Sequence, residues 1–191
     1  MIELMSPAEI ERGKVTGALV ADILQAMKAR STVGTNLLDI DRWAKDMILG
    51  AGAVSCYVDY APSFGRGPFG HYICTSVNDA VLHGLPHNYT LADGDLVSLD
   101  LAVSKAGVVA DSAISFVVGE SVSPADTAMI SATERALAAG IALGGLFWLC
   151  LRQLGKKQVR KREKEMRCIL GGEMALDKLL MLPDRHAAFQ A

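Results

Sequence analysis

Two aspartates, Asp100 and Asp111, are the residues whose type and spacing point most directly to chemistry. They lie in two β-rich runs, residues 94–103 and 108–117, which are separated by a Gly-containing break at residues 104–107. Two such runs predict a hairpin. If its pairing is centred between Lys105 and Ala106, Asp100 directly faces Asp111, with Cβ atoms about 5 Å apart, and like charges at that position are destabilising.

A divalent cation would remove this repulsion. The strands are otherwise apolar, so both carboxylates would also lose solvation on folding. Hard cations bind carboxylate oxygens, and the pair therefore predicts a metal site. The spacing leaves two alternatives open: both aspartates lie at an exposed edge in solvent, or a register slip separates them.

Three helices are predicted to pack with this hairpin. Ser6, Pro7 and Glu9 form a helix start with a capping box, and hydrophobic residues follow at helical spacing up to a stop at Gly34 (Ile10, Val15, Leu19, Ile23 and Met27). A second amphipathic helix is predicted from about residue 36 to 49. A third begins at Ser123 and Pro124 and runs to about Gly140.

The segment between the second helix and the hairpin is aromatic. Residues 53–72 contain Tyr57, Tyr60, Phe64, Phe69 and Tyr72 among several glycines and prolines. An aromatic loop over a strand end is typical of a surface that lines a pocket.

Composition restricts the classes of function. The chain has 191 residues, is 51% hydrophobic and carries a formal net charge of −2, which fits a globular protein with a real core and gives no global signal for DNA binding. The four cysteines lie far apart and the N-terminal residues lack a secretory pattern, so we expect free thiols and a cytoplasmic location.

The C-terminal part differs from the rest. Residues 136–151 form an apolar run that is shorter than the roughly 20 residues needed to span a bilayer, so we expect a buried helix end rather than a transmembrane span. Residues 152–167 follow with eight basic and two acidic residues, a local charge of +6. This cluster fits a solvated basic helix, or a contact with ribosomal RNA or an anionic membrane surface. A short helix is predicted from Glu173 to Leu182.

Two motifs together resemble type I methionine aminopeptidases, the pita-bread metallopeptidase family. Residues 74–86 (CTSVNDAVLHGLP) resemble the signature around the family's active-site histidine, and residues 94–100 and 109–112 resemble its two metal-binding strands. The match runs from Ile2 to about Ala142. It implies an α/β fold with a curved, mainly antiparallel sheet backed by helices.

The resemblance also implies roles for individual residues. Asp100 would bind one of two divalent metal ions (Mn, Co, Fe or Zn) and Asp111 would bridge both, generating a hydroxide nucleophile at neutral pH. His83 would be the catalytic histidine that hydrogen-bonds the scissile amide of the bound substrate. Cys74, Phe69 and Phe64 would line a pocket for methionine, although ordinary core packing explains these three equally well.

The family's second pseudo-symmetric half, which supplies a His and two Glu ligands, has no counterpart motif after Ala142. We therefore divide the chain into an aminopeptidase-like half-domain, residues 1–142, and a divergent, helical tail, residues 143–191, that reads like the product of a truncation or frame change. With three ligands missing, metal binding by the chain alone is expected to be weak.

Three functions remain open. The first is removal of N-terminal methionine from nascent peptides by metal-hydroxide attack, with the missing ligands supplied by another arrangement or by self-association through the exposed sheet. The second is an inactive remnant that retains the peptide pocket. The third is an interaction protein that uses the basic tail, for instance at the ribosome.

Overall fold

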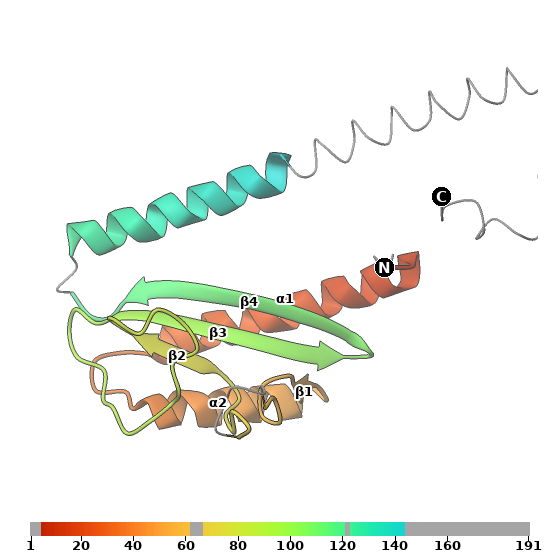
Figure 1. The fold of residues 1–191 in the computed structure, drawn as a ribbon, viewed down its shortest axis with the longest axis horizontal. Coiled ribbons are helices and arrows are strands. Elements are labelled where there is room, and N and C mark those ends of the chain that lie inside the picture. Colours follow the sequence, from red (N-terminus) through yellow and green to blue (C-terminus); the bar gives the residue numbers. More distant parts are fainter. Residues whose placement is uncertain (1–4, 62–66, 121–122, 144–191) are drawn as a thin grey trace, which may run out of the picture. The chain divides into compact units, whose positions relative to one another are not determined.

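The computed structural model describes residues 5–61, 67–120 and 123–143 of the chain. The chain divides into two compact units, Met1–Thr133 and Glu134–Ala191. The first contains two helices followed by four strands (Figure 1): α1 (Pro7–Arg30), α2 (Leu37–Gly50), β1 (Val54–Ser55), β2 (Cys74–Val77), β3 (Leu96–Lys105) and β4 (Val108–Val117).

Helix α1 begins as the sequence predicts. The Ser6 side chain accepts from the backbone N–H of Glu9, and the Glu9 side chain accepts from the backbone N–H of Ser6, which completes the capping box. The buried face was predicted only in part. Ile10 and Val15 are 47% and 59% exposed. The buried stripe starts only at Thr16, so Ile10 precedes it and Val15 lies beside it.

Helix α2 follows the predicted boundaries closely. The Asn36 side chain accepts a hydrogen bond from the Leu38 N–H at 3.0 Å and caps the first turn. Its buried residues recur at helical spacing: Leu37, Ile40, Ala44 and Ile48. Together with the stripe of α1 they form the helical side of the core.

The sheet is antiparallel and centred on β3. This strand pairs with β4 along its whole length on one side, and with β1 and β2 on the other. Alternate residues of β3 are fully buried in the core shared with the helices: Val97, Leu99, Leu101 and Val103. In Figure 1, α1 runs along β3 and β4, with which it makes many contacts. The residues between these positions, including Asp100, therefore point to the opposite face of the sheet.

A further helix spans residues 124–143, as the Ser123–Pro124 start predicts. Its part in the second unit begins at Glu134, and Leu137, Ile141 and Leu143 are all at least 65% exposed. The expectation of a buried helix end is therefore wrong for residues 136–143, because these apolar side chains remain open to solvent. The basic cluster and the helix predicted from Glu173 to Leu182 lie outside the described residues.

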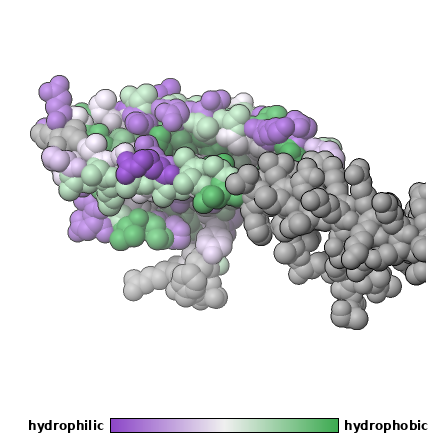
Figure 2. Space-filling model, turned by 90° about the horizontal axis from the view of Figure 1, so that it is seen from above, coloured by the Kyte–Doolittle hydropathy of each residue, from purple (hydrophilic) through white to green (hydrophobic). Residues whose placement is uncertain are grey.

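The surface mixes hydrophobic and hydrophilic residues on the face shown in Figure 2. Among the residues that the structure describes, none forms a helix both long enough and apolar enough to cross a membrane. Cys56 and Cys74, the cysteines within these ranges, are free thiols, as expected.

Candidate functional site

The register of the β3–β4 hairpin decides where the two aspartates lie. Asp100 pairs with Ala113 and Asp111 pairs with Ala102, so the prediction that the aspartates face each other directly is wrong. The turn consists of Ala106 and Gly107, with φ angles of 51° and 77°. Positive φ at both positions is typical of a two-residue type I′ turn. This turn moves the centre of pairing one residue beyond the predicted position.

The two carboxyl groups nevertheless share a site. Their paired positions are two residues apart along the ladder, so both side chains point to the same face as diagonal neighbours. The pKa of Asp111 is raised, first by burial and then by the negative charge of Asp100 and a side-chain hydrogen bond with it. Loss of solvation and charge repulsion, the two penalties inferred from the sequence, therefore both act at this pair.

Tyr57 holds one member of the pair. Its phenol donates a hydrogen bond to Asp100 Oδ1 at 3.0 Å. Burial, followed by the charge of Asp100 and this hydrogen bond, raises the pKa of the phenol, so it remains a donor at neutral pH. The sequence placed Tyr57 only in a general aromatic loop. The contact that gives it a role joins residues 43 positions apart, and no local pattern predicts that contact.

Cys74 lies directly across from Asp100 on β2. Burial raises the pKa of its thiol to about 12, and the charges of Asp100 and Asp111 add to the effect. Cys74 is therefore a neutral, buried thiol at physiological pH. Because nucleophilic cysteines need a stabilised thiolate, its surroundings favour a role in the wall of a pocket over a role as nucleophile.

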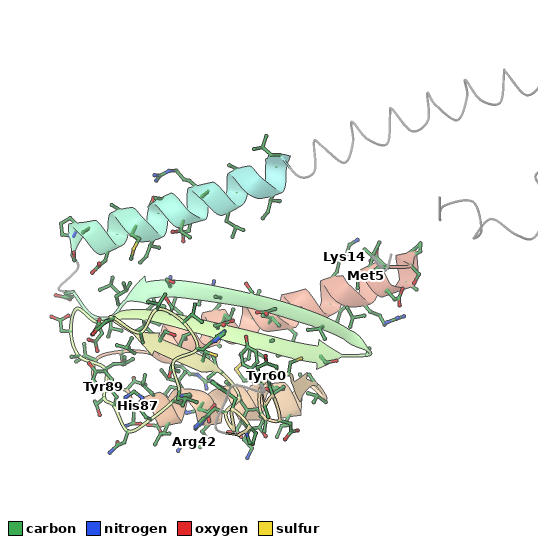
Figure 3. All side chains as sticks on the ribbon, viewed as in Figure 1. Met5, Lys14, Arg42, Tyr60, His87 and Tyr89 are labelled. Carbon is green, nitrogen blue, oxygen red and sulfur yellow. The ribbon has the colours of Figure 1, made fainter. Side chains whose placement is uncertain are left out.

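A cavity of about 360 Å³ opens beside this cluster. Three of the sequence-predicted site residues, Phe69, Cys74 and His83, line it, whereas Phe64 lies outside the described residues. The other lining residues are Tyr57, Tyr60, Gly67, Pro68 and Leu85. Tyr60, labelled in Figure 3, comes from the loop after β1. The cavity thus shares Tyr57 and Cys74 with the surroundings of the carboxylates and has mainly aromatic and apolar walls.

His83 reaches the cavity from a tight backbone turn. Its φ angle is 55°, in the left-handed region, and the residue is exposed. The following Gly84 donates its N–H to Ser76 Oγ at 3.0 Å, and its carbonyl accepts from the Thr75 N–H at 2.8 Å. A Cβ at Gly84 would collide with the backbone of Thr75 and Ser76. Glycine therefore allows the close approach to β2 that fixes His83 at the cavity.

The donor atoms of Asp100 and Asp111 suit a hard divalent cation. Both are carboxylate oxygens, and a cation between them would relieve the repulsion that raises the pKa of Asp111. Within the described ranges, however, no three His, Cys, Asp or Glu side chains gather closely enough to hold a metal ion. The two carboxylates therefore fit only part of a metal site.

Comparison with known proteins establishes the family. The model of metallopeptidase family M24 matches residues 11–144. The chain belongs to this family. It is 40% identical over 139 residues to methionine aminopeptidase 1 of Mycobacterium tuberculosis, an alignment that covers 72% of this chain and 49% of the relative. It is 33% identical over 137 residues to the methionine aminopeptidase of Helicobacter pylori, covering 71% and 51%.

Solved structures give the same picture. The crystal structure of methionine aminopeptidase from Rickettsia prowazekii superimposes with a TM-score of 0.68 at 26% identity, covering 74% of this chain and 54% of that one. The enzyme from Thermotoga maritima gives a TM-score of 0.64, also at 26% identity. These matches confirm the pita-bread class of fold predicted from the two motifs. The M24 chain spans about half the length of the relatives it matches.

Proposed function

We propose that this M24 chain provides one half of a methionyl aminopeptidase site, with the carboxylates for the metal ions and the pocket for the N-terminal side chain of a peptide. The observation that carries the proposal is the position of Asp100 and Asp111 on one sheet face, linked through Tyr57 and Cys74 to a cavity of about 360 Å³. A pair of hard ligands beside an apolar pocket suits hydrolysis of a bond next to an apolar side chain.

We assign the metal-binding role to Asp100 and Asp111, and Tyr57 orients Asp100 by its hydrogen bond. Divalent cations bound there would supply a water-derived nucleophile at neutral pH. His83, on the cavity lining, is assigned the hydrogen bond to the scissile amide of the peptide. Its exposure leaves the ring free to reach a bound substrate.

The pocket walls support methionine as the preferred side chain. Phe69 and Tyr57 present aromatic rings, and Cys74 adds a neutral sulfur. A flexible, polarisable thioether packs well against aromatic rings and sulfur. A negatively charged side chain would lose its solvation in such a cavity and lie near the like charges of Asp100 and Asp111.

The test is cleavage of the peptide Met-Gly-Met-Met by the full chain, with Mn²⁺ or Co²⁺ titrated. We expect metal-dependent release of methionine, with the missing ligands supplied by self-association of the chain. Asp111→Asn should abolish this release, and His83→Asn should reduce it about 10²-fold or more. Asparagine suits the second variant because it tolerates the positive φ at position 83.

A folded chain that releases no methionine at any metal concentration would contradict catalysis by this chain. The peptide pocket would then favour the alternative, an inactive remnant that binds N-terminal methionine. Peptide binding without turnover would separate that outcome from a chain that does not recognise peptides.

A further inference from the structure

One carboxylate outside the candidate metal pair ties helix α2 to the segment that enters β2. Asp41 Oδ2 accepts from His71 Nδ1 at 2.9 Å, and Asp41 Oδ1 accepts from the Tyr72 N–H at 2.7 Å. The two side chains are 16% and 28% exposed, so water competes little for these bonds. Both oxygens of Asp41 are therefore committed to the end of the aromatic segment.

Aromatic contacts continue from His71 to the cavity. The His71 ring packs edge-on to Phe69, with centroids 5.9 Å apart and planes at 81°. Phe69 packs edge-on to Tyr57 at 5.8 Å and 69°, and Tyr57 donates to Asp100. Edge-to-face arrangements of this kind are favourable and directional. An uninterrupted series of contacts thus joins α2 to the carboxylate pair.

The backbone of the same segment is held as well. The Phe69 N–H donates to the Tyr60 carbonyl at 2.9 Å, and the Gly70 N–H donates to the Val58 carbonyl at 3.0 Å. These bonds join the two limbs of the loop to each other. The Asp41 bonds join the loop to α2 in the helical layer, directly after Phe69 and Gly70.

We propose that Asp41 is a positioning residue, which acts through His71 to hold Phe69 against Tyr57 and thereby sets the shape of the methionine pocket beside Asp100. The identity of the pocket's ligand rests on the proposed function. The positioning itself is a property of the fold and is measured separately.

The first measurement is a set of double-mutant cycles in denaturant unfolding of the full chain. Asp41→Asn can keep the Tyr72 N–H on its amide oxygen, but it puts an NH₂ donor where Asp41 Oδ2 accepts from His71 Nδ1, so the charged acceptor for His71 is lost. Combined with Phe69→Leu, we expect the unfolding equilibrium constant to deviate from the product of the single effects by at least about twofold. Asp39→Asn is the matched control, because Asp39 lies on the same helix in an exposed ion pair with Arg42.

The second measurement is the affinity of the Mn²⁺-loaded chain for L-methionine amide, together with KM and kcat for Met-Gly-Met-Met. We expect Asp41→Asn to weaken binding and raise KM about fivefold, as the loss of one hydrogen bond implies, with kcat little changed. His71→Phe keeps a ring against Phe69 but loses the bond to Asp41. It should resemble Asp41→Asn, whereas Asp39→Asn should resemble the unmodified chain.

Together these results distinguish the positioning role of Asp41 from the proposed aminopeptidase function. Additive effects of Asp41→Asn and Phe69→Leu would overturn the positioning role, whatever the chain binds. Equal ligand affinity in Asp41→Asn, His71→Phe and the unmodified chain would overturn it too. Coupling in a chain that neither binds nor cleaves the methionine probes would support the positioning of Phe69 and count against the proposed function.

Discussion

At the scale of single residues, the pair formed by Asp100 and Asp111 destabilises the metal-free fold but is proposed to bind the metal ions. Asp111 has a raised pKa because of partial loss of solvation and the nearby charge of Asp100, so its ionised form is destabilised in the fold. We expect Asp111→Asn to stabilise the metal-free chain at neutral pH by less than about 1 kcal/mol, since the residue is exposed and screened. Denaturant unfolding with EDTA measures this.

The sign of the pH dependence follows from the raised pKa. The penalty is present when Asp111 is ionised in both the folded and unfolded states, and it disappears as the pH falls below the usual aspartate range. The advantage of Asp111→Asn should therefore fade on acidification. A variant that is less stable than the unmodified chain at neutral pH would contradict repulsion between Asp100 and Asp111.

Tyr57 gives a second prediction at this scale. Its hydroxyl fixes Asp100 Oδ1 while its ring stays in the cavity wall. Tyr57→Phe removes the hydrogen bond and keeps the ring, so we expect metal affinity to fall about tenfold with little change in methionine-amide affinity. Tyr60→Phe, in the same cavity, is the control. Unchanged Mn²⁺ affinity in Tyr57→Phe would show that Asp100 needs no such support.

At the scale of elements, the loop that carries His83 depends on contact with β2. Gly84 approaches the backbone of Thr75 and Ser76 too closely for any side chain. We expect Gly84→Ala to cost about 1–3 kcal/mol of unfolding free energy and to displace His83, which lowers activity beyond the loss of stability. Gly17→Ala, on α1 with open space around it, is the control. Equal stability of the two variants would contradict this role of Gly84.

Asp95, directly before β3, holds the segment between β2 and β3 that carries His83. It is 7% exposed, and it accepts from Asn78 Nδ2, the Tyr89 hydroxyl and the Ala92 N–H. Burial acts to raise its pKa, but these hydrogen bonds outweigh burial and lower it. Its contribution to stability is therefore present above the usual aspartate pKa and is lost as the pH falls through the lowered value.

We expect Asp95→Asn to cost about 1–3 kcal/mol at neutral pH, because a buried network loses an acceptor. Denaturant unfolding at several pH values measures the effect, and the difference from the unmodified chain should shrink in acid. An effect that is constant with pH would show that the charge of Asp95 is not what stabilises the network.

The same elements show why the sequence predicted some features and missed others. The start of α1 depends on Ser6 and Glu9, which are local, and the prediction is confirmed. The hairpin itself was predicted, but its register depends on the turn, and the Ala106–Gly107 dipeptide was not read as a two-residue turn. The hydrogen bonds of Tyr57 and Asp41 were not predicted, because their partners are distant in sequence.

At the scale of the whole molecule, family membership followed from two motifs in the right order, whereas the complete ligand set did not. The M24 chain spans about half the length of its relatives, and its described residues bring no three candidate ligands together, so Asp100 and Asp111 form an incomplete set. Carboxylates in such a partial set leave further coordination positions to water. We therefore expect Mn²⁺ binding that is weak but specific to this pair.

The most direct test is a Mn²⁺ titration of the full chain followed by electron paramagnetic resonance of the free ion. The unmodified chain and Asp39→Asn should bind Mn²⁺ with the same affinity, and Asp111→Asn and Asp100→Asn should each bind at least about tenfold more weakly. Equal Mn²⁺ affinity in all four proteins would contradict the central claim, because the two aspartates would then not be metal ligands.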